Sequence, residues 1–161
     1  MVQPVVLAER DIESVHTQVI IQTFSDRVLV IVTQLQKVGT LIQASVPATV
    51  ALSEASSDDI PSDATSTTLP PVHPSVDLTY LFGNAPSPDH QTLYSSYAAQ
   101  IAALVWTSEG HGQVGSSHTP VVVGVALKSP RPSEKPSGTD RATFLQVMDL
   151  VRDALGTART T

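Results

Sequence analysis

The spacing of apolar residues in the first third of the chain predicts three β-strands. They cover residues 16–24, 28–34 and 40–46. In the first of them, Val19 and Ile21 fall on one face while Gln18, Ile20 and Gln22 share the other, as expected of a strand with one strongly buried face. Short polar breaks separate the three runs, and connections this tight favour antiparallel pairing. We therefore expect the three strands to form a meander.

The rest of the chain follows the order strand, helix, strand, helix. Strands are expected at residues 76–82 and 118–127, and helices from residue 88 to between 106 and 109 and from 141 to 155. Ser87 and Pro88 suit the N-cap and first position of the first helix, and Gly156 suits the C-cap of the second. One face of each helix is apolar: Leu93, Tyr97, Ile101, Leu104 and Val105 in the first, and Phe144, Met148, Val151 and Leu155 in the second. The order predicts an α+β fold, a mostly antiparallel β-sheet meander with two α-helices packed on one face.

The second strand is apolar on both faces. Val28, Val30 and Val32 share one face, and Leu29 and Ile31 share the other. Such a strand has to be covered on both sides. The chain's own helices can cover one side, but so small a chain has few elements left for the other. We therefore expect a dimer and assign Val28, Val30 and Val32 to its interface. The strand before the last helix shows the same two-sided pattern and is expected to be central.

Two segments differ in composition from the rest of what we take to be a single domain, residues 1–161. Residues 47–75 hold five prolines and four acids but no Lys or Arg. They cannot bury enough apolar surface to offset the entropy of ordering, so we interpret most of them, about 53–75, as a mobile acidic insertion. A Pro-rich loop at about 128–140 carries, with Arg141, four basic residues. It is either a solvated linker or an electrostatic contact, with an acidic partner surface or with the acidic insertion of the same chain.

Composition narrows the functional class. The net charge is −6, without the clustered basic surface that binding to nucleic-acid phosphates requires. The absence of cysteine excludes disulfides and Cys-based zinc sites. No apolar run reaches the roughly 20 residues of a membrane-spanning helix, and acids near the N-terminus do not suit a signal peptide. We expect a soluble intracellular protein, cytoplasmic and also nuclear.

No catalytic or metal-binding motif stands out. His111 and His118 lack the third and fourth ligands of a metal site nearby in sequence. The glycines at 110–115 match GxGxxG, but they follow a helix and precede a strand, the reverse of a dinucleotide-binding motif. A nucleophile elbow of the GxSxG type is absent. We expect no enzymatic activity, no cofactor and no metal.

The end of the second strand and the turn after it hold polar residues that burial does not explain. They are Thr33, Gln34, Lys37, Gly39 and Thr40. One interpretation is an ordinary strand-end cap followed by a turn, with Gly39 at positive φ. The other is an exposed contact surface, where Gln34 and Lys37 reach the backbone or carboxylates of a partner. We assign the five residues to contact with a client protein.

The same region carries a family resemblance. Residues 24–41 read FS-x3-LV-x-VTQ-x2-K-x-GTL, and this order resembles the proteasome assembly chaperone 3 family. Weaker likeness continues through the later strands and helices. The acidic insertion and the loops at 110–117 and 128–140 depart from the family pattern.

The resemblance implies a non-enzymatic chaperone. Its α+β protomer would pack its sheet against the sheet of a second protomer, with the helices outside. The partner would be proteasome assembly chaperone 4 or a second copy, and the dimer would scaffold proteasome α-type subunits during α-ring assembly of the 20S proteasome. The alternative is a small dimeric longin- or roadblock-like scaffold in trafficking or signalling, which shares the size, acidity and lack of catalytic motifs.

Overall fold

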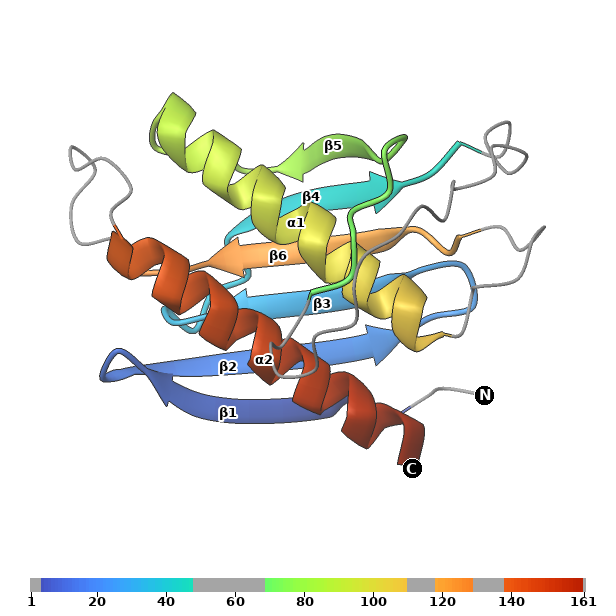
Figure 1. The fold of residues 1–161 in the computed structure, drawn as a ribbon, viewed down its shortest axis with the longest axis horizontal. Helices are drawn as coiled ribbons and strands as arrows, with labels where there is room; N and C mark the ends of the chain where they lie inside the picture. The colour runs from blue at the N-terminus through green and yellow to red at the C-terminus, as the bar shows by residue number, and fades with distance from the viewer. Residues whose placement is uncertain (1–3, 48–68, 110–117, 129–137, 161) are drawn as a thin grey trace, which may run out of the picture.

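The protein folds into one six-stranded sheet with two helices across one of its faces (Figure 1). A computed structural model describes residues 4–47, 69–109, 118–128 and 138–160. The elements in chain order are β1 (Val6–Ile12), β2 (Val15–Thr23), β3 (Val28–Thr33), β4 (Thr40–Ser45), β5 (Asp77–Phe82), α1 (Pro88–Ser108), β6 (Val121–Ala126) and α2 (Gly138–Thr160). The predicted α+β class with two helices packed on the sheet is confirmed.

The order of the strands differs from the predicted meander. The sheet runs β1-β2-β3-β6-β4-β5, so that β6 lies between β3 and β4 and pairs with β3 in parallel. The other neighbouring pairs are antiparallel. All six residues of β6 are buried, and such a strand is stable only inside a sheet. The prediction that this strand is central is confirmed, and the direct pairing of β3 with β4 was wrong.

Strand β1 was not predicted. It pairs with β2 along its whole length, from Val6 opposite Ile21 to Ile12 opposite Val15. Only its two end residues are buried, and its middle carries Glu9 and neighbouring charged residues. Because β1 is an edge strand with one mostly solvated face, its apolar alternation is too weak to identify it from sequence.

The start of α1 is the predicted one. Ser87 is the N-cap, with extended backbone, and its Oγ accepts a hydrogen bond from the backbone N–H of His90 at 3.3 Å. The end of α2 was predicted wrongly, because the helix continues through Gly156 to Thr160. A glycine ends a helix only when the chain turns there, and here Ala158 and Arg159, two good helix formers, lie in the turn that follows. α2 also begins at Gly138, inside the predicted Pro-rich loop.

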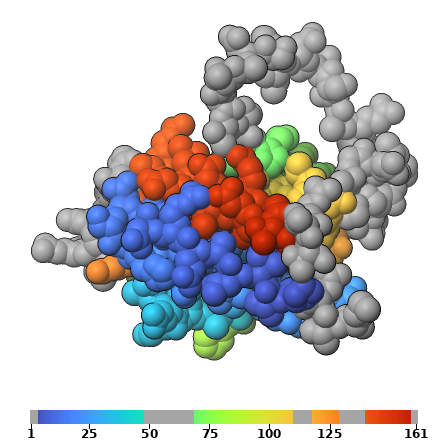
Figure 2. All heavy atoms as spheres, turned by 90° about the horizontal axis from the view of Figure 1, so that it is seen from below, coloured from blue at the N-terminus to red at the C-terminus, as the bar shows by residue number. Residues whose placement is uncertain are grey.

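The core lies between the sheet and the helices. Figure 2 shows the blue and cyan strands as a layer beneath the red helix α2. Fully or almost fully buried residues from the sheet are Ile12, Val19, Val30, Val32, Ile42, Val121, Val123 and Val125, and those from the helices include Tyr97, Ile101, Val105, Val147, Met148 and Val151. Neither described helix combines the length and apolarity that a membrane span requires.

Most of the predicted insertion and loop lies outside the described residues. This holds for residues 53–68 of the acidic insertion, for residues 129–137 of the Pro-rich loop and for His111. The last part of the predicted insertion is described and packs on the protein. Leu69 lies against the core, and the Pro70 carbonyl accepts a hydrogen bond from Gln100 Nε2 at 2.8 Å.

Candidate interaction surface

The sheet has a second face that no described helix covers, which we call the open face. Alternate residues of each strand point to it, because successive side chains of a strand lie on opposite sides. Its apolar members are Leu7, Ile20, Leu29, Ile31, Leu41, Phe82 and Val122. The strand register brings most of them side by side: Leu7 lies opposite Ile20, Ile20 opposite Ile31, and Leu41 opposite Phe82. They form a continuous apolar row from one edge of the sheet to the other.

This row is separate from the protein's own core. None of its residues belongs to the core cluster or packs against it. At the two edges Phe82 is 69% exposed and Leu7 is 55% exposed, whereas the members nearer the centre are buried or partly buried. Gly124 lies in the middle, where an added Cβ would lie 2.8 Å from the Val38 carbonyl oxygen and 3.4 Å from Ile31 and Leu41. A large contiguous apolar patch on a sheet face is typical of a protein–protein contact.

The predicted interface residues lie on the opposite side. Val28, Val30 and Val32 point toward the helices and are 2%, 0% and 0% exposed. The structure therefore places them in the core of the protomer. The helices cover the face of β3 that carries the valines, and the face that they leave uncovered carries Leu29 and Ile31. Sequence reasoning missed this because both faces of the strand are apolar, and the pattern does not say which one the helices cover.

The predicted client-contact residues lie in or beside the segment that joins β3 to β4, residues 34–39, which we call the crossover loop. Thr33 is 4% exposed, and its Oγ1 accepts hydrogen bonds from the backbone N–H groups of Leu35 and Lys37 at 3.2 and 3.1 Å. Thr40 is also buried, at 6% exposure. Gly39 has φ +71°, and an added Cβ would lie 2.1 Å from the Val125 carbonyl oxygen. These three residues therefore hold the loop in place.

Gln34 makes hydrogen bonds to β2, to β6 and to the segment that follows β6. Its backbone N–H donates to the Ala126 carbonyl at 2.9 Å, its Nε2 donates to Thr17 Oγ1 at 2.9 Å, and its Oε1 accepts from the backbone N–H of Lys128 at 2.9 Å. Of the five predicted residues, only Lys37 is exposed. Sequence reasoning missed Leu35 and Val38, which are each 46% exposed at the outside of the loop. Apolar residues inside an otherwise polar turn were the signal that could have identified them.

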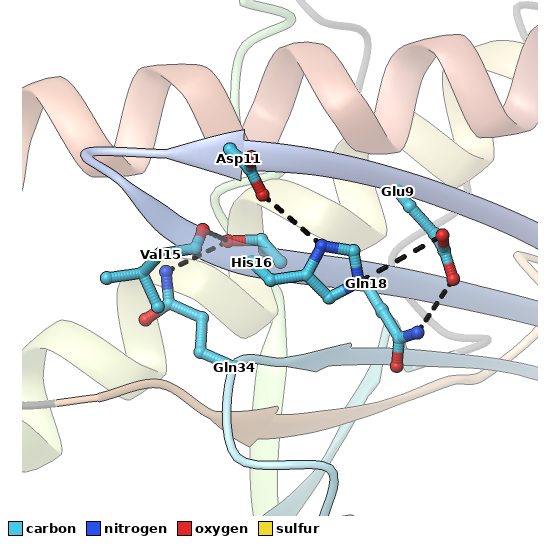
Figure 3. A network of polar contacts seen from close by, with 7 residues as sticks. Glu9, Asp11, Val15, His16, Gln18 and Gln34 are labelled. Carbon is cyan, nitrogen blue, oxygen red and sulfur yellow. Dashed lines mark hydrogen bonds and ion pairs between the residues drawn. The ribbon is translucent and has the colours of Figure 1, made fainter.

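A polar network occupies the β1–β2 corner of the open face (Figure 3). His16 lies between two carboxylates, with its Nδ1 3.3 Å from Asp11 Oδ1 and its Nε2 4.0 Å from Glu9 Oε2. Gln18 Nε2 donates to Glu9 Oε1 at 2.7 Å. These side chains are largely solvated, so the ion pairs contribute little to stability. The network borders the apolar row along β1 and β2 and gives the corner an acidic character.

Within the described parts of the chain, no group of three or more His, Cys, Asp or Glu side chains is placed to hold a metal ion. His118 instead contacts the edge of the Trp106 ring, at a centroid distance of 5.0 Å, and its ring also meets that of His73. The candidate functional features of the described residues are therefore two surfaces: the apolar row of the open face and the partly apolar crossover loop.

Comparison with known sequences agrees with this geometry. A search of curated proteins found no match to the chain. A sequence model of the family described as proteasome assembly chaperone 3 matches residues 30–153, from within β3 to within α2. The match covers more than half of the chain and includes the crossover loop and most of the sheet and helices. We conclude that the chain belongs to the proteasome assembly chaperone 3 family, a family of chaperones of proteasome assembly and not a class of enzymes.

Proposed function

We propose that this protein is a non-enzymatic assembly chaperone that dimerises through its open face. The partner is proteasome assembly chaperone 4 or a second copy of the chain, and the dimer scaffolds α-type subunits during assembly of the α-ring of the 20S proteasome, in the cytoplasm and nucleus. Family membership supports the role in proteasome assembly. The observation that carries the dimer is the apolar row across all six strands of the open face.

The size of the open face suits a stable contact. Six strands spaced about 4.8 Å apart, each about 20 Å long, give a flat area of about 500 Å² per protomer. Two such faces together provide about 1,000 Å², near the lower end of specific interfaces. Loops and side chains at the rim add to this area. The contact area is therefore large enough for a dimer that can also dissociate.

The expected geometry is a sandwich of two sheets. Sheets packed face to face lie about 10 Å apart, with their strands within about 30° of each other. The helix-covered face cannot form such a contact, because α1 and α2 already occupy it and its valines are buried. The helices of both protomers then lie outside, and the crossover loop of each protomer borders the contact, because the Val38 carbonyl oxygen lies against Gly124.

Sedimentation velocity tests the dimer. We expect the purified chain to sediment as a dimer, or as a monomer that dimerises when chaperone 4 is added. Phe82→Asp should weaken the contact, because it places a charge in the apolar row. Leu145→Asp is the matched control: Leu145 is 42% exposed on α2 and lies in the helix layer. A stable monomer under both conditions, or equal effects of the two variants, would contradict the proposal.

Reconstitution tests the scaffold. Recombinant α-type subunits should form α-rings, or partial rings, faster and in higher yield when the dimer is present, as followed by native mass spectrometry. Unchanged yield and rate with a dimer that is otherwise intact would argue against a role in α-ring assembly.

A further inference from the structure

The crossover loop and the residue after β6 bring four exposed side chains to one end of the sheet. Leu35 and Val38 are each 46% exposed, and Lys37 and Lys128 are exposed as well. We call these four residues the lysine end. Lys37 belongs to the loop between β3 and β4, whereas Lys128 follows β6, so the fold joins two segments that are distant in sequence.

The backbone beneath the lysine end is fixed. Thr33 Oγ1 accepts the backbone N–H of Lys37 at 3.1 Å, and Gln34 Oε1 accepts the backbone N–H of Lys128 at 2.9 Å. The loop also presses on β6, because a Cβ added at Gly124 would lie 2.8 Å from the Val38 carbonyl oxygen. A surface held in this way loses little conformational entropy when a partner binds.

The charges of the lysine end are not neutralised within the described parts of the protein. Three described arginines, Arg10, Arg27 and Arg152, pair with nearby aspartates at 2.6 to 3.5 Å. Neither Lys37 nor Lys128 makes an ion pair with a described residue. The chain as a whole carries a net charge of −6. Two lysines that pair with no described acidic residue, beside two exposed apolar side chains, are therefore a local positive patch on an acidic protein.

We propose that the lysine end is a docking surface for an acidic segment of a client subunit, one that also carries apolar side chains. Carboxylates of the segment would pair with Lys37 and Lys128, and its apolar residues would cover Leu35 and Val38. Thr33 and Gln34 act as positioning residues that hold the surface in shape. This inference rests on the proposed function, because it names the chemistry by which the dimer holds its client. It also replaces the predicted contact set with the side chains that the structure exposes.

Opposite charge is what selects this occupant. A positive patch attracts an acidic segment over distances of about a Debye length, roughly 8 to 10 Å in physiological salt. The apolar pair adds contact area only once the segment has docked. The lysine end borders the apolar row, because the Val38 carbonyl oxygen would lie 2.8 Å from a Cβ added at Gly124. A client would approach its exposed side chains from the end of the strands while the second protomer occupies the rest of the open face.

The test compares two double variants with equal change in charge. Lys37→Glu/Lys128→Glu reverses the lysine end. Arg27→Glu/Arg141→Glu makes the same change elsewhere, in the β2–β3 turn and on α2. Each dimer, formed with chaperone 4, is measured against individual recombinant α-type subunits by biolayer interferometry at 50 and 500 mM NaCl. A third variant, Leu35→Ser/Val38→Ser, tests the apolar pair without changing charge. Thermal melting and pairing with chaperone 4 check that every variant folds.

We expect the lysine-end variant to bind the client subunit at least tenfold more weakly at low salt and to lose most of the salt dependence. The matched control should bind as the wild type does, and the serine variant should bind more weakly at both salt concentrations. Equal binding by the lysine-end variant and the control would overturn the inference while leaving the proposed function intact. A wild-type dimer that binds no α-type subunit would contradict the proposed function, and the inference with it.

Discussion

Replacing Ile31 with aspartate tests whether the open face is the dimer contact, and Val30→Asp is its matched control. The two residues are neighbours on β3 but point to opposite faces of the sheet. Val30 is 0% exposed and lies in the core, whereas Ile31 is only partly buried and lies in the apolar row. The same substitution therefore places a carboxylate in the core at one position and on the open face at the next.

The expected magnitudes differ accordingly. An unpaired carboxylate at Val30 costs several kcal/mol, in addition to about 1.5 to 3 kcal/mol of lost apolar burial. Since domains of this kind are stable by about 5 to 15 kcal/mol, we expect Val30→Asp to be largely unfolded. At Ile31 the carboxylate can reach water in the isolated protomer, so the fold should lose only about 1 kcal/mol.

In the dimer the Ile31 carboxylate would be enclosed between two sheets. We expect a loss of at least about 3 kcal/mol of association free energy, because apolar contact is lost and a charge is desolvated. That is about a 100-fold increase in the dissociation constant. Sedimentation velocity over a range of concentrations gives this constant, and circular dichroism with thermal melting reports the fold. Ile31→Val should stay dimeric. Dimerisation of Ile31→Asp with wild-type affinity, or a folded Val30→Asp, would refute the assignment of the two faces.

Three further predictions concern the fold. Gly39→Ala should lower the free energy of unfolding in urea by at least about 2 kcal/mol, because the residue has φ +71° and its Cβ would collide with β6. Gly156→Ala lies in open space within α2 and should raise the free energy of unfolding by about 0.5 to 1 kcal/mol. Equal effects of the two variants would contradict the described conformation of the crossover loop. Ser87→Ala should cost about 1 kcal/mol of unfolding free energy through loss of the α1 N-cap, and Ser87→Asn should recover most of it. Burial raises the pKa of Tyr97 well above the ordinary value of 10.0, so the folded state keeps its proton where the unfolded state loses it. The stability that this shift contributes is fully present below pH 10 and is lost as the pH rises above it, so unfolding free energy should fall more steeply above pH 10 in the wild type than in Tyr97→Phe; parallel pH profiles would contradict this reasoning.

The sequence predicted best what is local. The start of α1 follows from Ser87 and Pro88, and the burial of both helices follows from apolar residues at helical spacing. The order of the strands is not local, because β6 reaches its place between β3 and β4 only after α1 has crossed the sheet. Strand β1 was not predicted, because the charged residues in its middle interrupt the apolar pattern between the buried Val6 and Ile12. Such features depend on contacts between distant segments, which short-range patterns do not record.

The candidate site was predicted in part, for a related reason. Thr33, Gln34 and Gly39 were singled out because the sequence offered two interpretations, a strand-end cap with a turn or a contact with a client. Their explanation is a set of hydrogen bonds and a close backbone approach within the protomer. The assignment of Val28, Val30 and Val32 to the interface required knowing which face the helices cover, and a strand apolar on both sides carries no such information.

Co-purification from the native cell tests the central claim most directly. The tagged wild-type chain and the tagged Ile31→Asp variant are recovered in parallel, and bound proteins are identified and quantified by mass spectrometry. The wild type should recover α-type proteasome subunits together with chaperone 4 or an untagged second copy, and the variant should lose this dimer partner. Recovery of neither dimer partner nor α-type subunits by a folded wild-type chain would contradict the central claim.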